Sequence, residues 1–230
     1  MTLQNILIYL LLASGASFSF IKHKLTLPGA VTGLVAGLFI YEGTGLTGFT
    51  MLCLFFIAGS WATSWHKNEK NISEANHPRT SGQVLANGGV AALLAIVAFI
   101  KPDLSPLLLV MLAGSLASAM ADTLSSELGM VYGKRFFNVI TFKKDERGLD
   151  GVVSVEGTLI GLGGAFVTAL LFWLFTDWSK ALYIITIAGF LGNIVDSILG
   201  ATLERKGIIG NNMVNLLNTL TGALVCYILA

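Results

Sequence analysis

Two aspartates inside apolar segments are the residues best suited to chemistry in this chain. Asp122 lies in AGSLASAMADTLSSELG and Asp196 in AGFLGNIVDSILGATLE, where ionisable side chains are otherwise scarce. A carboxylate inside a membrane is costly unless it meets a cation, water or a polar partner, so it is a functional-site hypothesis by default. The pair therefore predicts a site that gathers cations or polar ligands within a membrane domain.

Polar side chains share a helical face with each aspartate. Spacings of three and four residues place Ser118 and Ser125 with Asp122, and Asn193 beside Asp196. Two further apolar segments carry polar stripes at the same end, formed by Gln83 and Asn87 and by Asn211, Asn215 and Asn218. Interhelical hydrogen bonding explains any one of these side chains. Four stripes beside two aspartates favour one shared polar site.

The loops add groups that could hold phosphate. Lys67 and Arg79 precede the Gln83 stripe, and a second loop brings basic residues to a predicted helix N-terminus, with Lys143, Lys144 and Arg147 followed by Ser154, Glu156, Gly157 and Thr158. Mixed charges and glycines at a helix N-terminus suit phosphate oxygens together with a divalent cation. Oxygen ligands without cysteine or paired histidine favour Mg²⁺ or Mn²⁺ over zinc. A solvated basic loop is the alternative interpretation.

The elements that must position these groups are membrane helices. The 230 residues are 54% hydrophobic and 12% charged, with mean hydropathy +0.77, which is typical of a polytopic membrane protein. Because a membrane helix needs roughly 17 to 25 apolar residues, we predict a single all-α domain, 1–230, of about eight transmembrane helices. The expected spans are 3–21, 28–41, 46–64, 83–100, 104–127, 156–176, 181–203 and 212–229. The second is short and is expected to be re-entrant or tightly packed.

The distribution of basic residues predicts the orientation. If both termini lie outside, 12 of the 14 Lys and Arg residues fall in the cytoplasmic loops 22–27, 65–82, 128–155 and 204–210. Lys and Arg in short loops favour the cytoplasm. Both aspartates then lie toward the cytoplasmic face. The net charge of +1 gives no reason to expect nucleic-acid binding.

Glycine spacing predicts how the helices pack. Gly29, Gly33 and Gly37 repeat at intervals of four residues, and so do Gly157, Gly161 and Ala165. Small residues on one face let helix backbones approach closely in lipid. We therefore interpret both stripes as packing surfaces, while Gly157 would also let a phosphate approach backbone amides.

Common soluble nucleotide and hydrolase motifs are absent. The chain contains no Gly-x-x-x-x-Gly-Lys-Ser/Thr loop, no Gly-x-Ser-x-Gly turn and no Cys-x-x-Cys pair. A nucleotide would therefore have to be held by loops and helix ends.

Five motifs resemble those of the integral membrane family that includes eukaryotic transmembrane protein 19 and the chloroplast phytyl-phosphate kinase. In chain order they are Arg79-x-x-x-Gln-Val-Leu-Ala-Asn-Gly-Gly, Ala121-Asp-Thr-x-x-Ser-Glu-x-Gly, Gly148-x-x-Gly-Val-Val-Ser-Val-Glu-Gly-Thr, Asp196-Ser-x-x-Gly-Ala and Asn211-Asn-x-Val-Asn. The resemblance runs from about residue 25 to the C-terminus. It implies nucleotide-dependent phosphorylation of a prenyl monophosphate to the diphosphate, with CTP favoured as donor.

The resemblance suggests a role for each candidate residue. Asp122 and Asp196 would hold Mg²⁺ or Mn²⁺, with Glu127 or Glu156 completing the coordination shell. The phosphates would be neutralised by Lys67, Arg79, Lys143, Lys144 and Arg147, and oriented by Asn87, Ser154, Gly157, Thr158, Asn193, Asn211 and Asn215. Charge stabilisation and positioning are the main needs of phosphoryl transfer. The prenyl tail would lie between helices, and an oligomer is compatible with this arrangement.

Two other classes of function remain open at this point. A cation- or proton-coupled transporter would use Asp122 and Asp196 as its coupling pair, as carboxylates on broken helices near the midplane do in such proteins. A protein that only scaffolds others would leave the ordered motifs unexplained.

Overall fold

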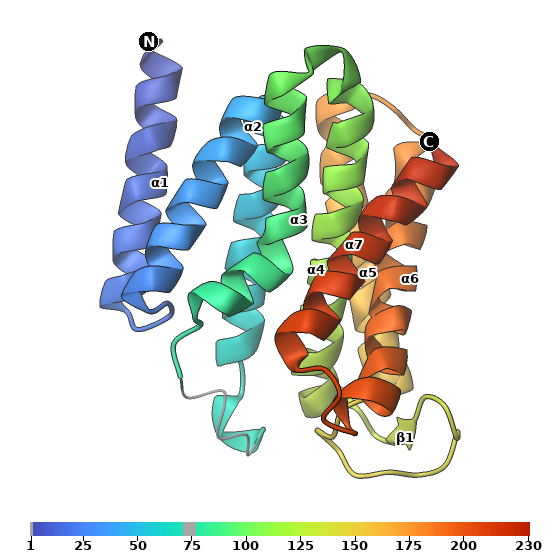
Figure 1. The fold of residues 1–230 in the computed structure, drawn as a ribbon. Coiled ribbons are helices and arrows are strands. Elements are labelled where there is room, and N and C mark those ends of the chain that lie inside the picture. The colour runs from blue at the N-terminus through green and yellow to red at the C-terminus, as the bar shows by residue number, and fades with distance from the viewer. Residues whose placement is uncertain (1, 71–76) are drawn as a thin grey trace.

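The protein is a bundle of apolar helices. The computed structural model describes residues 2–70 and 77–230. In this part of the chain seven helices are long and apolar enough to cross a membrane. They are α1 Leu3–Ile21, α2 Leu27–Ser64, α3 Ser81–Ile100, α4 Ser105–Tyr132, α5 Val155–Thr176, α6 Ala181–Leu199 and α7 Asn211–Leu229 (Figure 1). The prediction of an all-α polytopic membrane bundle is confirmed.

Short elements join the long helices at the two ends of the bundle. The 3₁₀ helices η1 and η3 cover Lys67–Glu69 and Pro102–Leu104. Strands β1, Phe137–Asn138, and β2, Val152–Val153, pair antiparallel, with Phe137 opposite Val153. A π-helical turn, η4, Gly200–Glu204, continues α6.

Two of the expected spans are the two halves of α2. Gly45 has φ 63° and ψ −151°, a non-helical conformation that glycine adopts most readily. An ideal Cβ on Gly37 would lie 3.5 Å from Leu52, and the rings of Tyr41 and Phe49 are 6.0 Å apart. Residues fifteen apart in a straight helix would be separated by about 22 Å. The chain therefore turns back at Gly45, and the expected spans 28–41 and 46–64 pack against each other.

The basic loops gather at one end of the bundle. Figure 1 shows both termini at the opposite end from the loops that precede α2, α3, α5 and α7. This arrangement agrees with the topology drawn from the Lys and Arg distribution. The cytoplasmic assignment of the loop end remains a prediction.

Side-chain caps start the helices that begin at the loop end. The Thr80 side chain caps α3 by accepting a hydrogen bond from the backbone N–H of Gln83. The Gln83 side chain accepts one from the backbone N–H of Thr80, which completes a capping box. Ser154 caps α5 by accepting from the Gly157 N–H at 3.1 Å. These caps fix the first turn of each helix. They thereby fix the positions of Gln83 and Thr158, which lie on those turns and border the cavity.

Small residues let α4 occupy the centre of the bundle. Most of the residues from Leu108 to Ala121 are buried. An ideal Cβ on Gly161 would lie 2.7 Å from the Ala121 carbonyl, and one on Gly157 would lie 2.8 Å from the Ser125 carbonyl. The predicted stripe of Gly157, Gly161 and Ala165 thus packs α5 directly onto α4.

Candidate functional site

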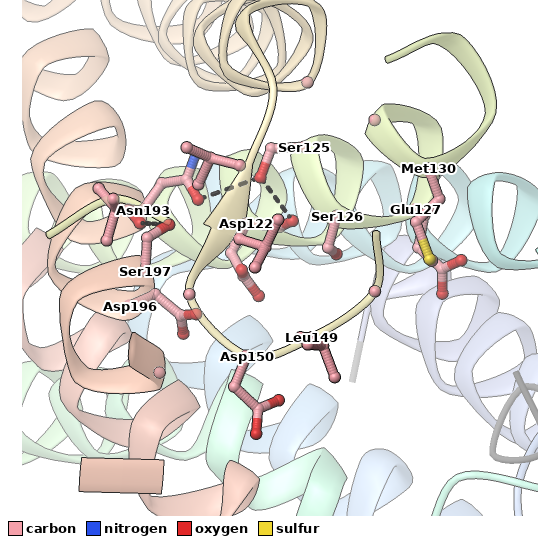
Figure 2. Close-up of a pocket in the computed structure, with 18 of the residues that line it drawn as sticks. Asp122, Ser125, Ser126, Glu127, Met130, Leu149, Asp150, Asn193, Asp196 and Ser197 are labelled. Carbon is pink, nitrogen blue, oxygen red and sulfur yellow. Dashed lines mark hydrogen bonds between the residues drawn. The ribbon is translucent and has the colours of Figure 1, made fainter. Parts of the chain in front are cut away.

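Asp122 and Asp196 come together at the loop end of the bundle. Their carboxyl groups are close enough to hydrogen-bond to each other, and Figure 2 shows both near the loop that carries Leu149 and Asp150. They border a cavity of about 540 Å³. Two carboxylates this close repel unless a proton, a cation or a cationic group lies with them. The pair is therefore built to receive positive charge.

Hydrogen bonds and close packing hold the helices that carry the pair. Ser125 on α4 donates to the side-chain oxygen of Asn193 on α6 at 3.1 Å. Ser118 donates to the Asn218 side chain and to its backbone carbonyl on α7. Between them an ideal Cβ on Gly192 would lie 2.8 Å from the Asn218 side-chain oxygen. The helices α4, α6 and α7 therefore pack closely together beside the site, with no spare volume at Gly192.

The loop 133–154 forms the roof of the cavity. Arg205 fastens it, donating to the Asp150 carbonyl at 3.0 Å and to the Asp145 carboxylate at 2.8 Å. The Arg205 guanidinium holds the pKa of Asp145 below its usual value. The stabilisation from this pair is therefore present at neutral pH and is lost as the pH falls through the folded-state pKa of Asp145. Arg147 ties the other side of the roof, donating to the Met130 and Glu69 carbonyls.

Gly151 provides the closest contact between this roof and α6. It has φ +70°, and an ideal Cβ would lie 2.3 Å from the backbone nitrogen of Ala201 in η4. Gly151→Ala is expected to displace the roof from η4 and to lower any activity of this site about tenfold, because both the backbone conformation and the contact exclude a side chain. Limited proteolysis of the loop and steady-state turnover measure the two effects.

Gly207→Ala is the matched control, because Gly207 has φ +68° and nothing within 4 Å of an ideal Cβ. It carries the same backbone strain without the contact. Equal effects of the two substitutions would show that the contact with η4 does not matter.

Arg79 supplies a positive charge on the opposite wall. Its guanidinium donates to the Thr63 hydroxyl at 3.0 Å, while its backbone N–H donates to the Lys24 carbonyl. Burial lowers the pKa of Arg79, and the nearby carboxylates of Glu127 and Asp122 oppose that shift. An arginine keeps its charge under such conditions. The site therefore contains a fixed cation within electrostatic range of Asp122.

A smaller chamber of about 150 Å³ adjoins the main cavity at Asp122. Its walls come from α3, α4 and α7 and are almost entirely polar, with Arg79, Gln83, Asn87, Thr123, Ser126, Glu127, Asn211 and Asn215. The Asn87 side-chain oxygen is buried without a hydrogen-bond partner among the described residues. Three of the predicted polar stripes thus meet around Asp122, and the fourth supplies Asn193 and Asp196 in the main cavity.

Lys70 is a buried charge that the sequence interpretation passed over. Its ammonium group donates to Glu127 at 2.7 Å and to the Ala62 carbonyl at 2.7 Å, and its side chain is 0% exposed. Glu127, expected as a metal ligand, is therefore held in an ion pair at the cavity wall. Lys70 was one of several loop cations in the sequence, and only the position of Glu127, five residues after Asp122, hints at a partner.

The structure brings most of the predicted site residues together. Besides Asp122 and Asp196, residues that border one or both chambers are Arg79, Asn87, Glu127, Ser154, Gly157, Thr158, Asn193, Asn211 and Asn215.

Five others lie outside both chambers: Lys67, Lys143, Lys144, Arg147 and Glu156. Glu156 instead accepts from the backbone N–H of Lys134. Arg147 donates hydrogen bonds to the carbonyls of Met130 and Glu69, so its observed contacts hold the roof.

Glu204 and His77 border the main cavity although the sequence did not single them out for the site. Glu204 ends the π-helical turn η4, a local distortion that no residue pattern announced. Within residues 2–70 and 77–230, no three His, Cys, Asp or Glu side chains group closely enough to hold a metal ion by themselves.

Comparison with known proteins places the chain in a family. The family described as integral membrane protein DUF92 matches residues 10–223. The chain belongs to this family. The resemblance found in the five motifs is thereby confirmed, and the DUF92 match covers every residue that lines the two chambers.

Three DUF92-like relatives show how far the similarity extends. Uncharacterized membrane protein MJ0933 of Methanocaldococcus jannaschii is 33% identical over 198 residues, which make up 86% of this chain and 82% of that protein. Uncharacterized membrane protein sll0875 of Synechocystis is 32% identical over 212 residues, 89% of this chain and 82% of that protein. Protein VTE6, chloroplastic, of Arabidopsis thaliana is 29% identical over 216 residues, 89% of this chain and 65% of that protein. No solved structure matches the chain significantly.

Proposed function

We propose that this DUF92 protein is a membrane phosphotransferase related to the prenyl-phosphate kinases. It would transfer the terminal phosphoryl group of a nucleoside triphosphate, with CTP favoured, to a prenyl monophosphate. The observation that carries the proposal is the meeting of Asp122 and Asp196 beneath a loop at one end of the bundle. The motif resemblance to the family of the chloroplast phytyl-phosphate kinase and the 29% identity to protein VTE6 support the prenyl acceptor.

The residues at the site fit a magnesium ion. Mg²⁺ is usually bound by one or two carboxylates, and its remaining positions are filled by water and substrate phosphates. Asp122 and Asp196 provide two such carboxylates, while Glu127 is already paired with Lys70. When bound, Mg²⁺ would supply charge neutralisation for the phosphates.

The chain's own residues would orient and neutralise the reacting groups. Arg79 would face phosphate oxygens from the cavity wall near Thr63. Asn193 would hold α6, the helix that carries Asp196, in place through its hydrogen bond with Ser125. The acceptor phosphate is already an anionic nucleophile, so its oxygen bonds to the terminal phosphorus as the bond to the leaving diphosphate breaks. No strong general base is required. Positioning and charge are the contributions expected of a phosphotransferase.

The proposal is tested with the purified full chain in lipid nanodiscs. We expect labelled CTP, ATP or GTP, with Mg²⁺ and phytyl or geranylgeranyl monophosphate, to yield the prenyl diphosphate, and excess chelator to stop the reaction. Thin-layer chromatography of the lipid product measures transfer.

Absence of diphosphate across this panel, with folded protein, would overturn the proposal. Gradient-driven uptake of a cation into proteoliposomes without product formation would instead favour the transporter.

A further inference from the structure

The wall of the main cavity combines polar and apolar side chains. Its polar side chains come from most of the elements around it, including Arg79 before α3, Asp122 on α4 and Asp196 on α6. Its apolar side chains come from the roof loop and from α6, and include Phe136, Phe137, Val139, Leu149, Phe190 and Ile194. A cavity that offers both charged groups and a cluster of apolar side chains suits a ligand with a charged head and an apolar tail.

The apolar wall continues along α6 toward the lipid-facing surface. Ile187, Phe190 and Ile194 are spaced by three and four residues, so they follow one face of the helix. Ile187 is 45% exposed on the outside of the bundle, whereas Phe190 and Ile194 are partly exposed and border the cavity. Thr158, on the first turn of α5, borders the same space. The cavity thus borders both the first turn of α5 and a continuous apolar strip on α6.

The smaller chamber offers no alternative place for a tail. Its lining is almost wholly polar, and burying hydrocarbon there would shield its amide and carboxylate groups from water without offering them hydrogen-bond partners. The strip on α6 joins the carboxylate pair to the apolar outside of the bundle without crossing a buried charge.

We propose that Phe190 and Ile194 bind the apolar tail of a phosphorylated lipid, which enters from the bilayer between α5 and α6 with its phosphate directed toward Asp122 and Arg79. This inference rests on the proposed function for the identity of the head group. It adds the route of the tail and the two side chains that select it. Phe190 and Ile194 are specificity residues, and neither takes part in moving the phosphoryl group.

Photo-cross-linking in nanodiscs tests the route without requiring turnover. The probe is geranylgeranyl monophosphate with a diazirine on its tail, and adducts are mapped by mass spectrometry. We expect adducts on α6 within residues 187–194, and we expect excess unlabelled prenyl monophosphate to suppress them. Adducts confined to α1, α2 or α3, or an absence of competed adducts, would overturn the route.

Substitutions separate tail binding from nucleotide binding. Phe190→Ala and Ile194→Ala are each expected to raise the half-saturating concentration of the lipid phosphate about tenfold, because each removes apolar contact area. The KM for the nucleotide should stay the same. Phe190→Leu should restore most of the affinity. Leu191→Ala is the matched control, since Leu191 is exposed on the same helix and does not border the cavity.

The outcomes distinguish this inference from the kinase proposal. Competed adducts on α6 without diphosphate formation would retain the lipid site and reject the kinase. Diphosphate formation with no response of the lipid KM to either alanine substitution would retain the kinase and reject the α6 route.

Discussion

Replacing Asp122 by Asn is expected to lower phosphoryl transfer by about 10²–10³-fold while the protein stays folded. The amide has nearly the same shape but no charge, so it cannot neutralise a bound cation beside Asp196. Removing one of two adjacent, partly buried carboxylates should not destabilise the bundle, because the repulsion between them disappears. Initial rates with saturating lipid phosphate, together with thermal unfolding in detergent, measure the two quantities.

Asp103→Asn provides the control for this substitution. Asp103 lies in η3, between α3 and α4, and is outside both chambers. Its loss should leave the rate unchanged. If Asp122→Asn retained more than half of the activity, the carboxylate pair would not be the centre of the reaction.

Replacing Lys70 by Met is expected to lower the free energy of unfolding by about 3 kcal/mol, because it leaves Glu127 without its partner. The Lys70 side chain is 0% exposed and the Glu127 side chain 17% exposed, so water can compensate only in part. The ammonium group also satisfies the Ala62 carbonyl near the end of α2. Denaturant unfolding of the detergent-solubilised protein, followed by circular dichroism, measures the change.

A double-mutant cycle identifies the cause. Lys70→Met combined with Glu127→Gln should recover a large part of the lost stability, since neither charge is then left alone. Lys67→Met serves as the matched control, because Lys67 is an exposed residue of the same short segment. If the double variant were as unstable as the two single losses added together, the ion pair would not account for the effect.

The fold was predictable to the extent that it depends on composition and periodicity. Apolar segment lengths predicted nearly all of the membrane helices, and the spacing of Gly157 and Gly161 predicted a packing surface, which the structure places against α4. The reversal at Gly45 was also foreseeable as a break between two apolar segments. Its geometry was not, because a single glycine fixes no direction without the packing of Tyr41 and Phe49 around it.

The candidate site was predictable where its residues lie on helices. Helical spacing placed Asp122 and Asn87 on polar faces, and those faces meet. Loop residues could not be placed in this way, since a charged loop has no period from which to read direction. Lys143 and Arg147 were assigned to the phosphates by charge, yet neither borders the cavity, and Lys70 was missed because its burial depends on a partner 57 residues away.

The close packing at Gly192 limits how substrates can enter and leave the site. Because α6 touches α4 and α7 there with no room even for a methyl group, these helices cannot slide past one another to open the site. Access for a water-soluble nucleotide at the loop end would therefore come from movement of the roof, which is fastened by the hydrogen bonds of Arg147 and Arg205. Such bonds can break and re-form while the bundle stays intact. The rate of product release would then depend on Arg147 and Arg205 in the loops, and the rate of phosphoryl transfer on Asp122 and Asp196 in the helices.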